Sequence, residues 1–250
     1  MFSPALYAIG SVILISAVSF VGLGTIAMGG ERLKKLVFIL VSLAAGGLLG
    51  DAFIHLIPEA FLSGGDPSRI SLLVLAGILL FFILEKILRW HHYHDTEESM
   101  HTTKHIGHMN LVSDGMHNFI DGLFIGVSYL VSVPVGIATT VAVFLHEIPQ
   151  EIGDFGVLIH SGYSTFRALF LNFCIALFAL LGVIIAVIVG PAVQGFSEAI
   201  LPLTAGTFIY IAASDLVPEL HKISDPKKSL LQLLFMLIGI GMMYGLLLFD

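Results

Sequence analysis

The chain has little charge and almost no cysteine. Only 12% of its 250 residues are charged, whereas a soluble domain usually carries about 25%. The single cysteine, Cys174, lies inside an apolar run, so a disulfide framework is excluded. Lysine and arginine number 11 against 18 acidic residues, a formal net charge of −7. This balance excludes a strongly basic nucleic-acid-binding surface, and we expect no nucleic-acid partner.

Apolar residues, in contrast, make up 57% of the chain, and the mean hydropathy is +0.98. They are gathered in repeated long runs, and crossing a bilayer takes about 20 apolar residues per helix. The first run lacks a basic start and a small-residue cleavage site, so we expect a retained helix. The sequence predicts one all-α, polytopic domain over residues 1–250, embedded in the lipid bilayer. Its eight transmembrane helices cover roughly 5–29, 36–62, 70–90, 107–130, 134–160, 166–190, 198–220 and 229–249.

The cationic residues are distributed unevenly between the two sides of this arrangement. Ten of the eleven belong to the connections after the first, third, fifth and seventh segments or to their flanks, and Arg69 alone lies opposite. Because cytoplasmic loops are enriched in lysine and arginine, both termini are predicted to be extracytoplasmic. The one longer connection, 91–106, is predicted to be a His-rich cytoplasmic loop that either captures metal or is simply solvated. Its histidines are His91, His92, His94, His101 and His105.

Two short matching motifs suggest internal symmetry. The second segment contains HLIPEA from His55, and the seventh contains DLVPEL from Asp215. On oppositely directed helices such a match indicates an inverted 3+2+3 repeat, a feature of transporters, although a chance match remains the alternative. His55 also lies four residues from Asp51 and from Glu59, on one helix face. It either lines a pathway or pairs with the seventh segment.

The fourth and fifth segments carry ionisable groups at membrane depth, where each costs about 2.5–3.5 kcal/mol on the insertion scale. They hold no lysine or arginine, so the acidic groups require protons, a metal ion or both. A purely structural role for so many polar groups is the less favoured alternative. The five carboxylates are those of Asp114, Asp121, Glu147, Glu151 and Asp154.

Helical spacing brings several of these groups onto common faces. Residues three or four positions apart lie on one side of a helix, which pairs His117 with Asp121 and His146 with Gln150. Imidazole with carboxylate suits zinc and similar first-row divalent ions, and the thiolates of a closed structural zinc site are missing. Pro149 is expected to kink its helix beside His146 and to free a backbone carbonyl.

The two stretches resemble the ZIP family of zinc- and iron-regulated transporter-like proteins. The sequence HNFIDG from His117 is similar to the family motif HNFxDG, and HEIPQE from His146 is similar to HExPHE. The resemblance covers essentially the whole chain. It implies a binuclear centre in which Asp121 bridges a principal ion and a second ion held by Asn118 and Glu147. The implied metal ligands are His117, Asn118, Asp121, His146, Glu147, Gln150, Glu151 and, on the sixth segment, Asn172.

One position departs from the family pattern. Gln150 stands where this branch has histidine and other branches have glutamate, and a neutral amide is a poorer ligand than either. The compact chain is expected to be a prokaryotic-type member in the inner membrane. The resemblance further implies a homodimer, and movement of the first, fourth, fifth and sixth helices as a block against the other four.

We therefore expect a carrier of zinc, or of cadmium, iron or manganese, that moves its ion toward the cytoplasm by alternating access. Asp154, Glu151 and His160 are hypothesised to form a release path, with His55 as another pathway residue. Two alternatives use the same acidic core. One is an intramembrane zinc metalloprotease or hydrolase, because His146-Glu147 begins like HExxH, and the other is a gated divalent cation channel.

Overall fold

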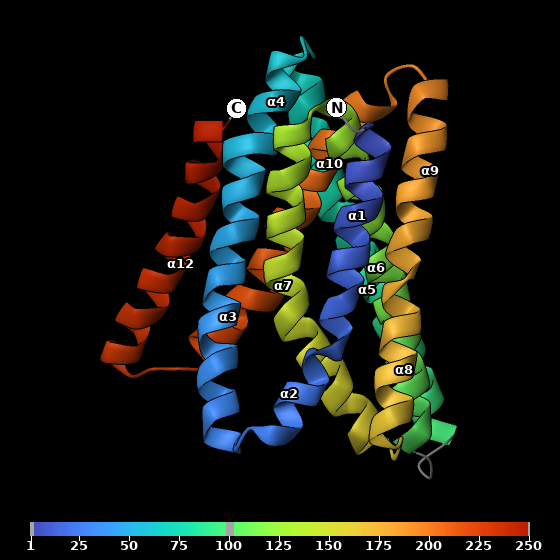
Figure 1. The fold of residues 1–250 in the computed structure, drawn as a ribbon, viewed down its shortest axis with the longest axis vertical. Coiled ribbons are helices and arrows are strands. Elements are labelled where there is room, and N and C mark those ends of the chain that lie inside the picture. Colours follow the sequence, from blue (N-terminus) through green and yellow to red (C-terminus); the bar gives the residue numbers. More distant parts are fainter. Residues whose placement is uncertain (1–2, 99–102, 250) are drawn as a thin grey trace.

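The computed structural model describes residues 3–98 and 103–249, and all regular secondary structure within these ranges is helical. The helices form one upright bundle (Figure 1). In chain order the elements are α1 (Pro4–Ser16), η1 (Ala17–Phe20), α2 (Val21–Ala27), α3 (Gly30–Asp51), η2 (Ala52–Leu56), α4 (Ile57–Leu62), α5 (Pro67–Glu98), α6 (Thr103–Val131), α7 (Val133–His160), α8 (Thr165–Ala176), α9 (Phe178–Ala192), α10 (Phe196–Ile211), η3 (Ala212–Leu216), α11 (Val217–His221), α12 (Pro226–Leu246) and η4 (Leu247–Phe249).

These elements trace eight helical passages, as the apolar runs predict. Six of them are long and apolar enough to cross a membrane. The other two, α6 and α7, have 29 and 28 residues and are long enough, but they carry the acidic and imidazole side chains. The six apolar passages are Pro4–Ala27, Gly30–Leu62, Pro67–Ile87, Thr165–Ala192, Phe196–His221 and Pro226–Leu246. The chain is thus a multi-pass α-helical membrane protein.

The His-rich stretch 91–106 differs from the expected loop. Helix α5 continues through Glu98, and α6 already begins at Thr103. Residues 91–98 contain neither glycine nor proline, so nothing in their sequence ends the helix. His101 lies outside the described residues, and a role of the stretch in metal capture stays a prediction.

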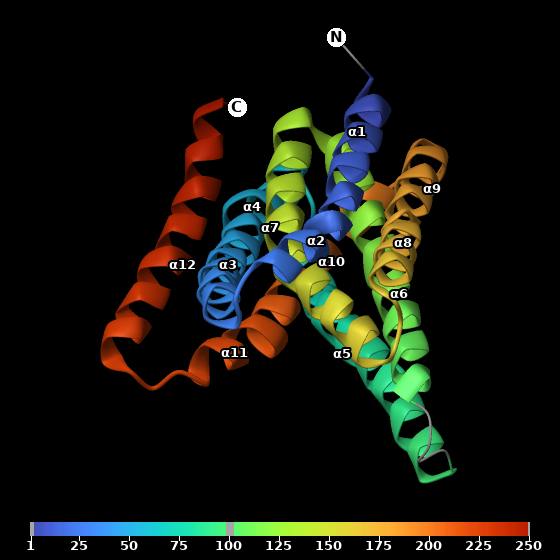
Figure 2. The same cartoon turned by 60° about the horizontal axis from the view of Figure 1, so that its bottom comes forward.

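The passages fall into two groups that meet at the centre (Figures 1 and 2). In one group α6 packs against α1, α7, α8 and α9; in the other α3 packs against α12 and α5 against α10. Contacts of α7 with α3, and of α6 with α10, join the groups. Glycine permits the closest approaches: a Cβ on Gly122 would lie 1.9 Å from the Ala179 carbonyl oxygen. At Gly153, in contrast, a Cβ would meet nothing within 4 Å, so this glycine does not mark a close approach of helices.

Two of the passages contain a π-helical turn at equivalent points. The turns are Ala52–Leu56 and Ala212–Leu216, and each is followed by a proline at the first or second position of the next helix. A π turn holds one extra residue, and such turns are frequent at functional sites. Both lie beside the Pro-Glu pairs of the matching sequence motifs.

Adding one methyl group at the α5–α10 contact should destabilise the fold. A Cβ on Gly206 would lie 2.0 Å from the Val74 carbonyl oxygen, and backbone cannot yield as a flexible side chain does. We expect Gly206→Ala to cost about 1–3 kcal/mol, measured by thermal unfolding in detergent. The control is Gly241→Ala, where nothing lies within 4 Å and alanine should be neutral or stabilising. Equal melting temperatures for the two variants would contradict the close contact.

Candidate metal site

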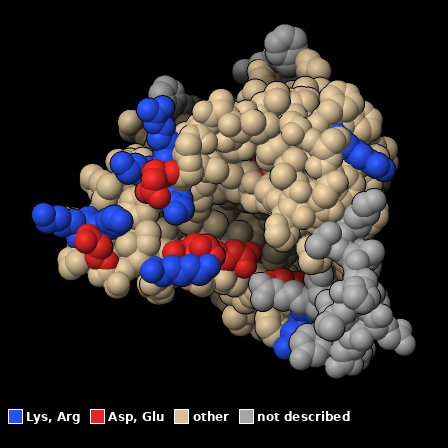
Figure 3. All heavy atoms as spheres, turned by 90° about the horizontal axis from the view of Figure 1, so that it is seen from below, with Lys and Arg blue, Asp and Glu red and all other residues tan. Residues whose placement is uncertain are grey.

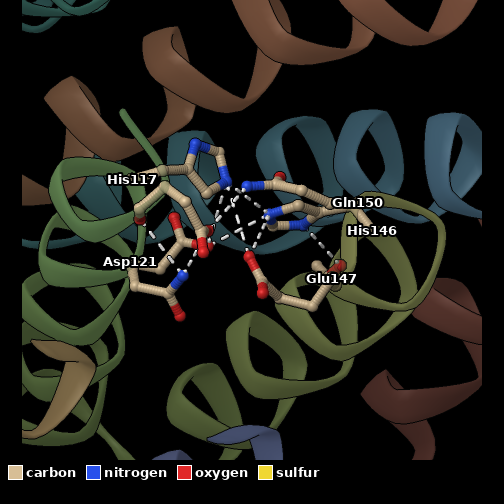
Figure 4. Close-up of polar contacts among 8 residues, drawn as sticks. His117, Asp121, His146, Glu147 and Gln150 are labelled. Carbon is tan, nitrogen blue, oxygen red and sulfur yellow. Dashed lines mark hydrogen bonds and ion pairs between the residues drawn. The ribbon is translucent and has the colours of Figure 1, made fainter. Parts of the chain in front are cut away.

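The site lies between α6 and α7, an antiparallel helical pair joined by Ser132 alone. The Ser132 hydroxyl accepts a hydrogen bond from the Val135 amide at 3.3 Å, which caps the start of α7. At mid-height the side chains of His117, Asp121, His146 and Glu147 turn toward one another (Figure 4), and one ligand atom of each lies within 4.8 Å of the others.

The distances in this cluster suit one small cation. From His146 Nε2 to Asp121 Oδ2 is 3.0 Å, and to His117 Nε2 3.2 Å. His117 Nε2 lies 3.5 Å from both Asp121 Oδ2 and Glu147 Oε1, and His146 Nε2 lies 3.7 Å from Glu147 Oε1. Ligand atoms at about 2.0–2.1 Å around a tetrahedral zinc ion are about 3.3 Å apart. The four atoms therefore already have nearly the spacing of a zinc shell.

The surroundings orient the two histidines toward the cluster. His146 Nδ1 lies 3.1 Å from the Ala142 carbonyl oxygen, which can only accept a hydrogen bond; this contact turns Nε2, the nitrogen that would bind a metal, toward Asp121. Rings from the other helix group cover the site: Phe81 packs edge-on to His117 at 5.9 Å, and Phe208 to His146 at 6.3 Å. His146, Asp121 and Glu147 are at most 3% exposed.

A second polar group follows one turn away. The Asn118 amide donates to the Asp114 carboxylate at 2.7 Å, and the Gln150 amide donates to the same oxygen at 3.4 Å. Both sequence-predicted amides thus use their nitrogens on Asp114, which leaves their oxygens as metal-ligand candidates. Asp114 is a central member of this group, although its sequence position marks it only as one of several carboxylates.

Two further pairs continue along the helices. The Asn172 amide of α8 donates to Glu151 at 2.9 Å, so these two residues hold each other beside the central cluster. The Asn110 amide donates to Asp154 at 2.9 Å. Asn110 was not identified from the sequence, but it lies four residues before Asp114 on the same face of α6, and that spacing is the signal that could have found it.

The remaining pathway candidates lie apart from the cluster. His160 is exposed at the end of α7. His55 Nδ1 lies 3.3 Å from Asp51 Oδ1 within its own helical passage, and both side chains are at most 2% exposed. The pairing is therefore with a neighbour on the same helix, while α10 packs over this turn.

A cavity of about 770 Å³ leads away from the cluster. It reaches His117 and His146, passes Asp114, Gln150 and Asp154, and ends among residues of α5, η3 and α11. Seen from below, the molecule is hollowed there, and acidic side chains lie at the opening (Figure 3). On the opposite side of the cluster, toward the α6–α7 connection, lie buried apolar residues: Phe124, Ile125, Val143, Leu201, Ala205 and Phe208.

A multi-pass helical membrane protein with a buried imidazole–carboxylate cluster at the end of a cavity is a protein built to handle a divalent cation within the bilayer. Comparison with known proteins agrees. A family model described as ZIP zinc transporter matches residues 2–105 and 90–247. The chain therefore belongs to the ZIP family of zinc transporters.

Individual relatives are similar over most of their length. Zinc transporter ZIP13 of Pongo abelii is 39% identical over 230 residues, covering 86% of this chain and 67% of the relative. Zinc transporter zipt-7.1 of Caenorhabditis briggsae is 32% identical, with 82% and 70% covered. Zinc transporter SLC39A7 of Rattus norvegicus is 32% identical, with 95% and 71% covered.

Membership makes the chain a transporter and not an enzyme, which removes the metalloprotease alternative, and it makes zinc the transported substrate. These relatives are animal proteins. The expectations of a prokaryotic-type chain and of an inner-membrane location therefore find no support in them.

Proposed function

We propose that the chain carries zinc toward the cytoplasm by alternating access, with His117, Asp121, His146 and Glu147 as the ion's ligands. The carrying observation is the buried four-residue cluster at the closed end of a cavity. A site reached from one side and sealed on the other is what one state of an alternating carrier requires. A channel would need a path open to both sides.

The distribution of charge supports the direction. The connections α2–α3, α7–α8 and α11–α12 lie at the end of the bundle where the cavity opens (Figure 1), and Arg32, Lys34, Lys35, Lys222 and Lys228 are there. By the preference of cationic loops for the cytoplasm, this end faces inward. The termini then lie on the extracytoplasmic side, and the cavity is an inward-facing exit.

The two helix groups supply the moving parts. The ligands belong entirely to the α6–α7 group, whereas Phe81 and Phe208, which cover them, belong to the other. Sliding one group against the other carries the site past its cover without breaking the ligand set. The matching π turns of the second and seventh passages favour an inverted 3+2+3 repeat. The family resemblance supports a homodimer.

Exit of the ion follows the carboxylates along the cavity. Asp114 and Asp154 line its wall, and Glu151 lies beside it in a pair with Asn172. Asn118 and Gln150 have amide oxygens next to the four proposed ligands. A neutral amide is a poorer metal ligand than imidazole or carboxylate, so a second ion bound there is held more weakly than the first. His160 stands near the cytoplasmic end of this path.

The proposal is tested by zinc uptake into proteoliposomes that enclose a fluorescent zinc indicator, with cadmium and manganese as competitors. Uptake should saturate with external zinc, because each cycle must empty one site. Absence of flux for every divalent ion contradicts the proposal, and flux that rises linearly with zinc identifies a channel.

The inward-facing cavity makes a separate prediction. Ser113 lines it, so Ser113→Cys, in a background with Cys174→Ser, should react with a membrane-impermeant maleimide from the cytoplasmic side only. Saturating zinc should change the labelling rate if the cavity opens and closes during transport. Equal labelling from both sides would contradict a sealed outer half.

Zinc binding should weaken in acid. Imidazole and carboxylate must lose their protons to bind metal, so protons compete with the ion. We expect the apparent zinc affinity to fall steadily as the medium is acidified below neutrality, measured by calorimetry on the purified protein. An affinity independent of pH would exclude the imidazoles as ligands.

A further inference from the structure

A second cavity lies beside the mouth of the first, where α12 leaves α3, and the two share Val37, Val41, Glu219 and Lys222 in their linings. The two helices touch closely in one region: a Cβ on Gly46 would lie 2.1 Å from the Met236 carbonyl oxygen, and one on Gly239 would lie 2.4 Å from that of Leu43. Below this contact α12 inclines away from α3 (Figures 1 and 2). The wedge between them is a groove of about 760 Å³, within the roughly 300–1,000 Å³ of small-molecule sites.

The walls of the groove are apolar and its rim is cationic. Side chains of α3 such as Val37 and Phe38 face Leu220, Ile223 and Leu231 across it. The buried Gln232 uses its amide to donate to the Leu220 carbonyl at 3.1 Å, which fixes α12 to the end of α11. Four lysines and two glutamates complete the lining, namely Lys34, Lys35, Lys222, Lys228, Glu31 and Glu219.

Half of this cationic charge is already paired. Lys34 Nζ lies 3.3 Å from Glu31 Oε1, and Lys222 pairs with Glu219. Lys35 and Lys228 are exposed and make no ion pair in the part of the chain that the structure describes. The groove therefore offers two uncompensated ammonium groups at the open end of an apolar wedge.

We propose that this groove binds an anionic phospholipid, with one acyl chain in the wedge and the phosphate between Lys35 and Lys228. At membrane depth an acyl chain fills such a wedge, because its apolar walls would otherwise have no packing partners. Basic pockets between helices at the cytoplasmic boundary bind acidic headgroups preferentially. The two lysines therefore determine that the bound lipid is anionic.

The bound lipid touches the transport machinery. Ile152 of α7 also lines the groove, and it directly follows Glu151 on the helix that carries His146. A chain in the groove thus contacts both helix groups at once. Its presence should change the rate at which they slide, without changing the ligands of the ion.

Native mass spectrometry of the purified full chain tests binding, with phosphatidylglycerol compared against phosphatidylcholine. We expect phosphatidylglycerol to be retained preferentially, and Lys35→Gln with Lys228→Gln to weaken its binding by roughly ten- to thirtyfold. The matched control is Lys227→Gln, because this neighbouring lysine does not line the groove. Leu231→Trp should fill the wedge and lower retention of the lipid while every lysine is kept.

Equal retention of the two lipids overturns the proposal, and so does a Lys227→Gln loss as large as that of the double variant. If Leu231→Trp separates a dimer while lipid retention is unchanged, the groove belongs to a second copy of the chain. Zinc uptake in phosphatidylcholine vesicles with and without phosphatidylglycerol gives the functional readout: wild type should be faster with the anionic lipid, and the double variant should not respond. Because the binding readout needs no transport, it remains decisive if the proposed zinc carrier activity fails.

Discussion

His146→Ala should abolish saturable zinc uptake. The His146 Nε2 atom is the centre of the cluster, 3.0 Å from Asp121 Oδ2 and 3.2 Å from His117 Nε2. Its loss leaves three ligand side chains around a space that water must fill. Removing a residue that only hydrogen-bonds to a metal ligand costs about 10–100-fold in metal affinity. Because His146 is itself a proposed ligand, we expect its loss to lower zinc affinity by roughly 100-fold or more.

His160→Ala is the matched control, since the same helix carries both residues and His160 is exposed at its end. The control should keep the wild-type zinc affinity, although the maximal rate changes if His160 assists release. Both variants should be compared for expression and elution from a sizing column before uptake is measured. Wild-type uptake by His146→Ala would remove the cluster as the transport site.

Gln150→His should bind zinc more tightly and transport it more slowly. Gln150 lies one turn beyond His146 on the cavity wall, with its amide 3.4 Å from the Asp114 carboxylate. Imidazole is a better zinc ligand than a neutral amide, so the variant adds a zinc-binding position between the cluster and the opening of the cavity. We expect at least about tenfold tighter binding and a lower maximal rate, because release then requires a further bond to break.

The control places a histidine nearby but outside the motif. Gly153 also lines the cavity, and a Cβ added there would meet nothing within 4 Å, so Gly153→His should fold. It should leave zinc affinity nearly unchanged, with calorimetry and initial uptake rates as the measurements. Equal gains in affinity from both histidines would show a general effect of cavity polarity and contradict a specific position at residue 150.

The passages were largely predictable because their cause is local. Each membrane-spanning run is an apolar stretch between breakers, and a helix is the only open-chain solution for its backbone in lipid. What failed was where helices continue or break. Residues 91–98 of the His-rich stretch extend α5 because they contain no breaker, and the interruption at Leu177 between α8 and α9 has no glycine or proline beside it.

The site residues, too, could be predicted only where the signal is local in sequence. His117 with Asp121 and His146 with Glu147 follow from the spacing on two successive helices, and the structure brings them together. The partners of Asn172 and Asn110 could not be read from the chain, because they depend on how α8 and α6 lie against α7. The role of Gln150 is likewise set across helices, by the Asp114 carboxylate of α6.

The single-residue link at Ser132 has a consequence for biosynthesis. All four candidate ligands lie between His117 and Glu147, in two helices that pair directly, so no contact within the cluster spans more than 30 residues of sequence. Local contacts form fast, whereas distant ones wait for loop closure. The ligand set can therefore assemble as soon as this hairpin enters the membrane, while α10, whose Phe208 packs on His146, is still being synthesised.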